Sequence, residues 1–246
     1  IGNQTQLNAQ LNYIYRGNYG LVSKEELLVA GCNEELATKI YRMKEKFAFG
    51  EFIPSDKMFN LKKLLNKKIE IKNNVFIIRK ATNQFEISYC GEKVDIDLNI
   101  KPWECYKPTY DLGFRDIERD HFSIIHSGDG DGWDIHQPCM GSIIYYNSDI
   151  YLVDAGPHLL SALSALGISV SEIKGLFQTH SHDDHFSGLT TLIKTDHKLD
   201  YYTTPFVRAS VSKKLSALMS DEDDMLNKYF TIKDLTLNEW NNIGGL

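Results

Sequence analysis

Three histidines and two aspartates stand between positions 180 and 185, within the stretch QTHSHDDHFSG. Neutral imidazole nitrogens and carboxylate oxygens are ligands for zinc, iron or manganese. Crowded together without a cation, these groups would repel one another or lose solvation. The pattern therefore predicts a metal site formed by His180, His182, Asp184 and His185.

The spacing of these residues indicates two ions rather than one. Residues 180 and 182, two apart in an extended segment, point the same way. Residues 184 and 185, at the start of a helix, diverge and can reach a second ion. A purely structural zinc site would more often include cysteine, and none lies nearby. An adventitious cluster of surface histidines is the other alternative, but such clusters rarely show this spacing.

Strands and helices that alternate from residue 118 onward must position this cluster. The texture predicts strands in FSIIHSG (122–128), SIIYYNSDIYLVDAG (142–156), IKGLFQTH (173–180) and DYYTTP (200–205), and helices in HLLSALSALG (158–167), HFSGLTTLIK (185–194) and FVRASVSKKLSALM (206–219). This is an α/β pattern. The cluster follows a buried strand, and the carboxyl ends of strands are where α/β sheets place their sites.

The first part of the chain predicts a separate mixed domain, residues 1–117, ahead of a second domain at 118–246. Ser23 with Glu26 forms a capping-box pattern, and Asn33 is a candidate N-cap, so two helices should follow one another closely. A helix-turn-helix that reads DNA and a simple packed pair both fit. Residues 69–100 alternate as hairpin strands with turns at 73–74 and at Gly91, and a proline-containing linker follows.

Bulk composition constrains the class of protein. The 246 residues carry 27 basic and 33 acidic side chains, so the net charge of −6 gives no general attraction for polyanions. Residues 39–80 are the exception, with twelve basic against four acidic side chains, a net +8. This segment is either a solvated face or a contact for nucleic acid or an acidic partner. No apolar run is long enough to span a membrane.

The four cysteines are widely spaced, at positions 32, 90, 105 and 139. They form no Cys-x-x-Cys pair, which suits packing roles in a reducing compartment. A cytoplasmic location is therefore expected. The chain begins at Ile1 rather than at a methionine, so we expect a fragment or a processed product.

The stretch THSHDDH followed by FSGL, with YLVDAG upstream, resembles the metallo-β-lactamase superfamily over about residues 118–246. The resemblance implies the first half of an αββα sandwich. It also implies that His180 and His182 bind one divalent ion and Asp184 and His185 a second, with zinc expected and iron or manganese as alternatives. Asp154 would orient ligands. A bridging water with a pKa lowered to roughly 7 would supply a metal-bound hydroxide for hydrolysis.

The superfamily completes its site with a histidine, a bridging aspartate and a final histidine from the second half of its fold. After His185 this chain has only His197, which is too close to match any of them. We therefore expect the second half to come from residues outside this sequence or from another chain. A homo-oligomer is one such arrangement. Without it, an apolar sheet face would stay exposed and metal would bind weakly.

The glycine-rich loop SGDGDG resembles the early loop of ribonuclease Z-like and cyclic-nucleotide phosphodiesterase members. Together with the basic segment, it favours phosphodiester hydrolysis of a nucleotide or nucleic acid, with Asp184 as the catalytic residue that holds or deprotonates the water. A carboxylic ester, lactone or thioester hydrolase is the alternative enzyme. A diiron oxygen sensor or a non-catalytic interaction module is the alternative of another class.

The remaining histidines carry weaker predictions. His126 and His136 flank the glycine-rich loop, so either a substrate contact or an ordinary loop role fits them. His158 is expected on the surface at a helix start. Asp131 and its acidic neighbours do not meet the spacing of an EF-hand.

Overall fold

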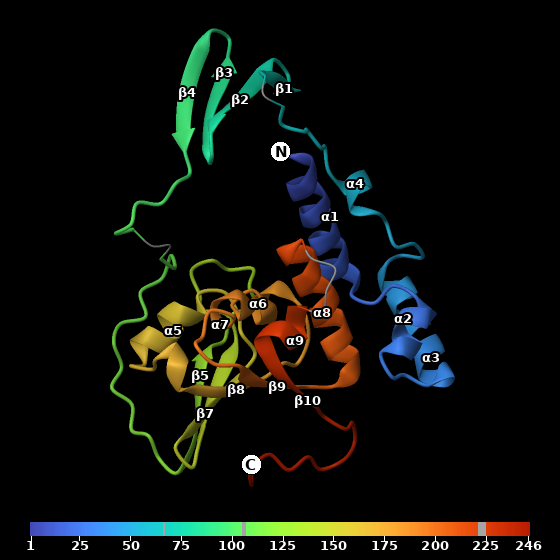
Figure 1. The fold of residues 1–246 in the computed structure, drawn as a ribbon, viewed down its shortest axis with the longest axis vertical. Helices are drawn as coiled ribbons and strands as arrows, with labels where there is room; N and C mark the ends of the chain where they lie inside the picture. Colours follow the sequence, from blue (N-terminus) through green and yellow to red (C-terminus); the bar gives the residue numbers. More distant parts are fainter. Residues whose placement is uncertain (66, 105–106, 221–224) are drawn as a thin grey trace.

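The computed structural model describes residues 1–65, 67–104, 107–220 and 225–246 (Figure 1). The helices are α1 (Gln4–Tyr19), α2 (Lys24–Val29), α3 (Glu34–Phe47), α4 (Ser55–Met58), α5 (Leu159–Ala165), α6 (Asp183–Phe186), α7 (Leu189–Leu192), α8 (Pro205–Met219) and α9 (Met225–Tyr229), with a 3-10 turn η1 (Val170–Glu172). The strands are β1 (Ile69–Lys72), β2 (Val75–Ala81), β3 (Gln84–Tyr89), β4 (Glu92–Asp97), β5 (Phe122–Gly128), β6 (Gly141–Tyr146), β7 (Asp149–Val153), β8 (Ile173–Phe177), β9 (Leu199–Thr203) and β10 (Phe230–Asp234).

A six-stranded sheet forms the second half of the chain, in the order β10-β9-β8-β7-β6-β5. Strands β5, β6 and β7 are antiparallel, with the glycine-rich loop between β5 and β6 and a tight turn between β6 and β7, whereas β7, β8, β9 and β10 run parallel. Parallel neighbours need crossovers, and helices α5 to α9 supply them. The predicted α/β class is therefore observed, in a mixed sheet.

One hydrophobic core lies between this sheet and its crossover helices. Leu152 of β7, Leu176 of β8 and Tyr201 of β9 pack with Leu163 of α5 and Leu215 of α8, all almost fully buried. Burial of large apolar side chains contributes about 1.5–3 kcal/mol each. The core thus fixes the strand ends from which the histidine cluster projects.

The opposite face of the sheet carries aromatic side chains. Phe177 stacks on Tyr202 with ring centroids 4.8 Å apart, and Tyr151 packs against both. Tyr151 and Tyr202 are buried. These aromatic side chains therefore already shield one another over the middle of that face.

The helix expected over 185–194 is broken into two short helices. Helix α6 ends at Phe186, and α7 begins at Leu189. Between them, Gly188 packs so closely that a Cβ there would lie 2.1 Å from the carbonyl oxygen of Gly156. The break brings the chain after the cluster against the turn that follows β7.

The helix pair predicted near the N-terminus is confirmed, with one difference. Ser23 and Asn33 cap α2 and α3 through their side chains. The reciprocal half of the expected capping box is absent, because Glu26 instead accepts from the Val22 N–H and from Arg16. Glu26 thereby ties α2 to α1 rather than closing its own helix start.

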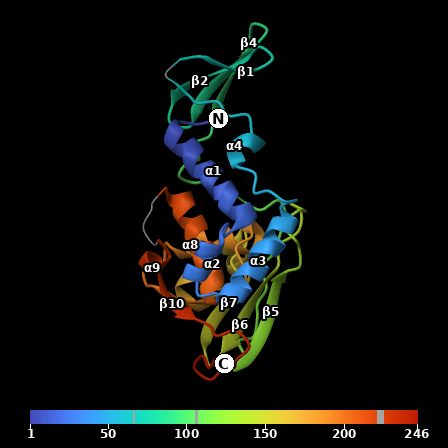
Figure 2. The ribbon, with the colours of Figure 1, turned by 90° about the vertical axis from the view of Figure 1, so that its right-hand side faces the viewer.

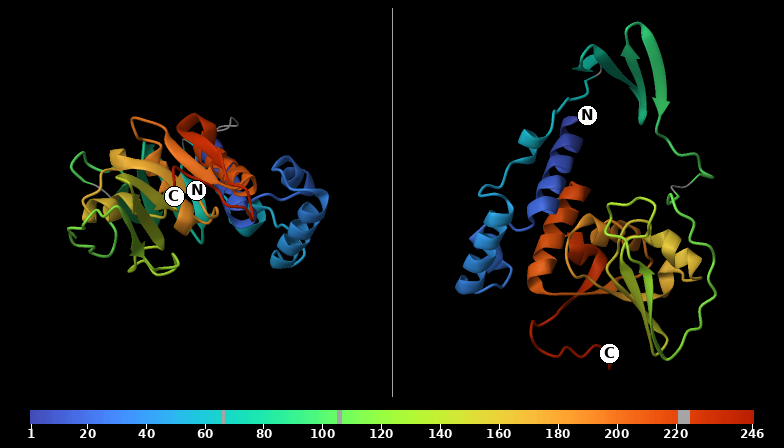
Figure 3. Two further views of the ribbon diagram at one scale, coloured as in Figure 1. Left: turned by 90° about the horizontal axis from the view of Figure 1, so that it is seen from below. Right: turned by 180° about the vertical axis from the view of Figure 1, so that it is seen from behind.

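Helix α1 lies along α8, so the N-terminal part of the chain contacts the six-stranded half directly (Figure 3). Leu21, Leu27 and Ala37 form a second small core, against which Phe206 and Ala209 of α8 pack. The division into units of 1–117 and 118–246 remains a prediction. Whatever the boundary, the first helices are anchored on α8.

The strands predicted over 69–100 form an antiparallel meander, β1-β2-β3-β4. Asn73 and Asn74 both adopt positive φ, as a tight hairpin turn requires, and Gly91 turns the last hairpin. This sheet stands apart from the six-stranded sheet in two perpendicular views (Figures 1 and 2).

Over the described residues, no helix is both long and apolar enough to cross a lipid bilayer. Of the four cysteines, Cys32, Cys90 and Cys139 are free, and Cys105 lies outside the described residues.

Candidate metal centre

Two adjacent parallel strands deliver the cluster to one edge of the sheet. Strand β7 ends at Val153, which pairs with Phe177 at the end of β8. The next residue of each strand continues the pairing, because the Asp154 N–H donates to the Phe177 carbonyl at 2.8 Å. Asp154 and the segment from Gln178 onward therefore meet at the carboxyl ends of two rigid strands.

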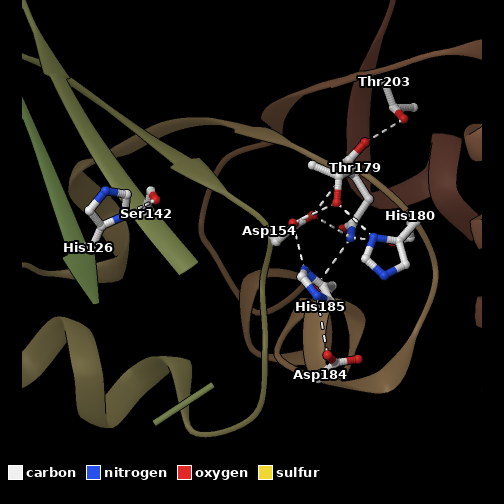
Figure 4. Close-up of polar contacts among 9 residues, drawn as sticks. His126, Ser142, Asp154, Thr179, His180, Asp184, His185 and Thr203 are labelled. Atoms are coloured by element: carbon white, nitrogen blue, oxygen red, sulfur yellow. Dashed lines mark hydrogen bonds and ion pairs between the residues drawn. The ribbon is translucent and has the colours of Figure 1, made fainter. Parts of the chain in front are cut away.

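Asp154 is the hub of the hydrogen bonds that organise the cluster (Figure 4). Its Oδ1 accepts from Gln178 Nε2 at 3.0 Å and from the Thr179 N–H at 2.8 Å. Its Oδ2 accepts from the Thr179 hydroxyl at 2.7 Å and faces His185 Nδ1 at 2.8 Å. The side chain is buried, and its φ of +64° lies in the left-handed region, which is strained for a non-glycine residue.

These bonds fix the tautomers of two histidines. An ionised carboxylate only accepts, so the neutral His185 ring donates its Nδ1 proton to Asp154. The single Thr179 hydroxyl proton also goes to Asp154, so Thr179 Oγ1 accepts from His180 Nδ1, 2.8 Å away. Both imidazoles therefore carry their lone pair on Nε2, the nitrogen that is left free to bind a metal ion.

The ligand-type atoms converge. One atom each from His180, His182 and Asp184 lie within 4.8 Å of one another, and so do atoms from Asp154, His180 and His185. The ring centroid of His180 is 4.7 Å from that of His182 and 4.1 Å from that of His185. The structure thus brings together all five residues that the sequence singles out.

Burial lowers the pKa of His180, and the neighbouring imidazoles of His185 and His182 lower it further. His180 is therefore neutral at physiological pH, which is the form that can bind a metal ion.

Glycines let the surrounding loops approach Asp184. A Cβ on Gly156 would lie 2.3 Å from the Asp184 carbonyl oxygen. Gly132, at φ +84°, brings the glycine-rich loop so near that a Cβ would stand 2.7 Å from Asp184 Cβ. The loop therefore borders the cluster.

A cavity of about 480 Å³ lies beside the cluster. It is lined by His182, Asp183 and Asp184, by Asp131 to Trp133, and by residues of α1, Asn18 among them. Trp133 is 90% exposed, so its ring is free to contact a bound molecule.

The other histidines lie outside the cluster. His126, on β5, hydrogen-bonds Ser142 at 2.9 Å, away from the hub (Figure 4). His136 is an exposed loop residue, and His158, at the N-cap position of α5, is exposed and makes no side-chain capping hydrogen bond. His197 lies between α7 and β9, as expected, and bonds Asp196.

Sequence reasoning missed two groups of residues. Gln178 and Thr179 directly precede the first histidine, and their position beside the motif was a usable signal. Tyr13 and Lys214 both contact Asp183, yet they come from α1 and α8 and carry no local signal. Asp183 itself had been given no role.

An α/β sheet in which an aspartate ends one parallel strand and a His-x-His-x-Asp-His cluster follows the next matches part of the metallo-β-lactamase fold. A sequence model of the family described as Anti-Pycsar protein Apyc1 matches residues 122–246, which is 125 of the 246 residues. The chain belongs to this family. Helix α1 lies outside the matched region.

Two curated proteins of Dictyostelium discoideum are similar in sequence. The cGMP-dependent 3',5'-cGMP phosphodiesterase A is 26% identical over 118 residues, 48% of this chain and 14% of that protein. The cAMP/cGMP-dependent 3',5'-cAMP/cGMP phosphodiesterase B is 31% identical over 97 residues, 39% of this chain and 9% of that protein. The chain thus matches a small part of each relative.

Solved structures with a similar arrangement include three proteins of low sequence identity. A diphosphatase of the PhnP family has a TM-score of 0.37 and 14% identity, over 46% of this chain and 50% of that one. The short form of human tRNase Z has a TM-score of 0.35 and 17% identity, over 45% and 44%. The metallo-β-lactamase fold protein YhfI of Bacillus subtilis has a TM-score of 0.37 and 16% identity, over 49% and 48%.

Proposed function

We propose that this chain carries a divalent-metal centre for the hydrolysis of a cyclic nucleotide 3',5'-phosphodiester. One observation carries the proposal: three imidazoles and a carboxylate converge at a strand end, with two of the imidazoles locked in the ligand tautomer. Membership of the Apyc1 family and similarity to two cyclic-nucleotide phosphodiesterases support the substrate class.

The donor set fits a metal ion. His185 Nε2 lies 3.2 Å from Asp184 Oδ2. A lone pair and a carboxylate oxygen at that distance repel each other unless a proton or a cation lies between them. Two ligands of one tetrahedral zinc ion lie roughly 3.3 Å apart, given bonds of about 2.0–2.1 Å. His185 and Asp184 are therefore spaced as partners on one ion.

In this proposal His180 and His182 hold one ion, and Asp184 and His185 hold a second. Asp154 is not a ligand, because each of its oxygens already takes part in two hydrogen bonds. It fixes the rings of His180, through Thr179, and of His185. Zinc is the expected metal, with iron or manganese as alternatives, and bound ions would supply Lewis acidity at the phosphoryl group and a water of lowered pKa.

The chain's own groups then divide the remaining work. Asp184 borders the cavity with one carboxylate oxygen near His185, so it can accept the proton of an attacking water. The exposed ring of Trp133 offers a stacking surface for a nucleobase. Asn18 supplies an amide donor and acceptor at the cavity wall.

The proposal is tested by turnover of 3',5'-cyclic nucleotides in protein supplied with Zn²⁺, Mn²⁺ or Co²⁺. We expect product release that is lost in His182→Ala and retained in His197→Ala, whose ring lies outside the cluster. A simple lactone and bis-p-nitrophenyl phosphate are assayed beside the cyclic nucleotides. Lactone cleavage with no turnover of any cyclic nucleotide would overturn the substrate class.

A further inference from the structure

Asp183 stands between two of the proposed ligands, His182 and Asp184, and is held by two helices distant in sequence. Its Oδ1 accepts from Lys214 Nζ of α8 at 2.6 Å and from the Tyr13 hydroxyl of α1 at 2.5 Å. Lys214 Nζ also donates to the Ser181 carbonyl at 2.6 Å. The residues on both sides of His182 are thus tied to the same ammonium group, Ser181 through its backbone carbonyl and Asp183 through its side-chain carboxylate.

Lys214 is buried to an unusual degree for a lysine, with 1% of its side chain exposed. Its ammonium lies over the ring of Phe186 at 4.6 Å and that of Tyr13 at 5.1 Å. A buried ammonium is very unfavourable unless it is paired and hydrogen-bonded. Asp183 and the Ser181 carbonyl are the partners of this ammonium. A shift of the chain at 181–183 would therefore leave the buried Lys214 ammonium without them.

Helix α1 also borders the cavity. Tyr13, Gly17 and Asn18 line it together with His182 and Asp184. The family match begins at residue 122, so α1 borders the site from outside the matched region. It reaches both the cavity and, through Tyr13, the segment of proposed ligands.

We propose that Lys214 and Tyr13 are positioning residues: by holding Asp183 and the Ser181 carbonyl they set the direction in which His182 and Asp184 face the metal. The metal itself rests on the proposed function. The alternative is that the contact only stabilises the packing of α1 and α8. In that case, loss of the contact would lower the free energy of global unfolding. The local order of residues 180–186 and the metal affinity of the folded protein would not change.

Three variants test the proposal: Lys214→Met, which keeps an unbranched side chain one atom shorter and without the charge, Asp183→Asn and Tyr13→Phe. The matched control is Lys213→Met, the neighbouring lysine of α8, which is 51% exposed and lies 3.6 Å from Glu26. Because the Asp183 side chain is 64% exposed, Asp183→Asn should fold even if Lys214→Met does not. Each protein is measured for global unfolding, for Co²⁺ affinity with its visible spectrum, and for hydrogen exchange without metal.

We expect Lys214→Met and Asp183→Asn to bind Co²⁺ roughly 10–100-fold more weakly, with an altered visible band. Tyr13→Phe, which loses one hydrogen bond, should lose roughly fivefold. Lys213→Met should stay within about twofold, as a surface pair would. In the metal-free proteins, amides 180–186 should exchange faster in Lys214→Met while those of α5 keep their rates.

Unchanged exchange at 180–186 in both Lys214→Met and Asp183→Asn would overturn the positioning role. So would Co²⁺ affinities and spectra equal to those of the wild type. If the wild-type protein binds no Co²⁺, the proposed metal centre fails. The exchange rates of the metal-free proteins then still decide whether Lys214 and Asp183 order the segment.

Discussion

Replacing Asp154 with asparagine should disable the centre while leaving its shape intact. The amide oxygen of Asn can keep the two contacts of Oδ1, from Gln178 Nε2 and the Thr179 N–H. The amide NH₂ then faces the Thr179 hydroxyl and His185 Nδ1, both of which donate to Oδ2 in the wild-type protein. The Thr179 hydroxyl can rotate and accept a hydrogen bond from this NH₂. The His185 Nδ1–H cannot bond it, because both groups are donors.

His185 must therefore take the other tautomer, with its proton on Nε2. That proton can bond Asp184 Oδ2, 3.2 Å away, and the lone pair needed by a metal is lost. The four charge-assisted hydrogen bonds of the Asp154 carboxylate become neutral ones, each weaker by about 1 kcal/mol, so the free energy of unfolding should fall by about 4 kcal/mol. Metal affinity should fall roughly 10–100-fold, the usual effect of losing a residue that orients a ligand.

The assays are urea unfolding of the metal-free protein, Co²⁺ titration, and nitrogen NMR of the His185 ring. Asp149→Asn is the matched control, because its carboxylate lies at the exposed first residue of β7 and accepts one long hydrogen bond of 3.4 Å from the Tyr151 hydroxyl. It should change none of the three readings by a comparable amount. The reasoning is refuted if Asp154→Asn keeps wild-type Co²⁺ affinity and His185 keeps its proton on Nδ1.

Three further predictions concern the surroundings of the site. Trp133→Ala should raise the KM for cyclic nucleotides roughly tenfold with little change in kcat, as expected if the base stacks on this ring; steady-state kinetics would show an unchanged KM if it does not. Gly156→Ala should destabilise the fold and weaken Co²⁺ binding, because its Cβ would lie 2.3 Å from the Asp184 carbonyl; equal melting temperatures would contradict this. Burial opposes ionisation of Glu26, but hydrogen bonds from Arg16 and the Val22 N–H outweigh burial and lower its pKa below 4.5. The ionised Glu26 therefore stabilises the fold above pH 4.5, and this stabilisation is lost as the pH falls through the lowered pKa. Glu26→Gln should reduce the free energy of unfolding by about 1 kcal/mol near neutrality and by progressively less in acid, as urea unfolding at several pH values would reveal.

Sequence periodicity was sufficient for the elements that position the cluster. Apolar runs located β5 to β9, but the expected strands at 142–156 and 173–180 extended to Gly156 and His180, three residues past the observed ends at Val153 and Phe177. The runs could be found because a strand buried on both faces is apolar along most of its length. The same reasoning placed His180 at the edge of the sheet.

Long-range contacts could not be predicted in this way. Lys214 lies on a helix whose sequence resembles any half-buried helix, and its contact with Asp183 depends on how α8 packs over α6. Tyr13 is 170 residues from Asp183 along the chain. These contacts arise only from tertiary packing, so no local pattern of residue types predicts them.

Local hydrogen-bond choices were also beyond the sequence. Ser23 and Glu26 fit the capping box, yet Arg16 of α1 offers Glu26 a charged partner that the pattern does not include. The break at Gly188 likewise follows from the close approach of the chain at Gly156, which only the fold reveals.

The most direct test of the metal centre is a crystal structure of zinc-loaded protein with an anomalous difference map at the zinc edge. We expect a peak about 2.0–2.2 Å from Nε2 of His180 and a ring nitrogen of His182, and a second beside Asp184 and Nε2 of His185. No peak within bonding distance of these four side chains, or zinc bound only elsewhere on the molecule, would contradict it.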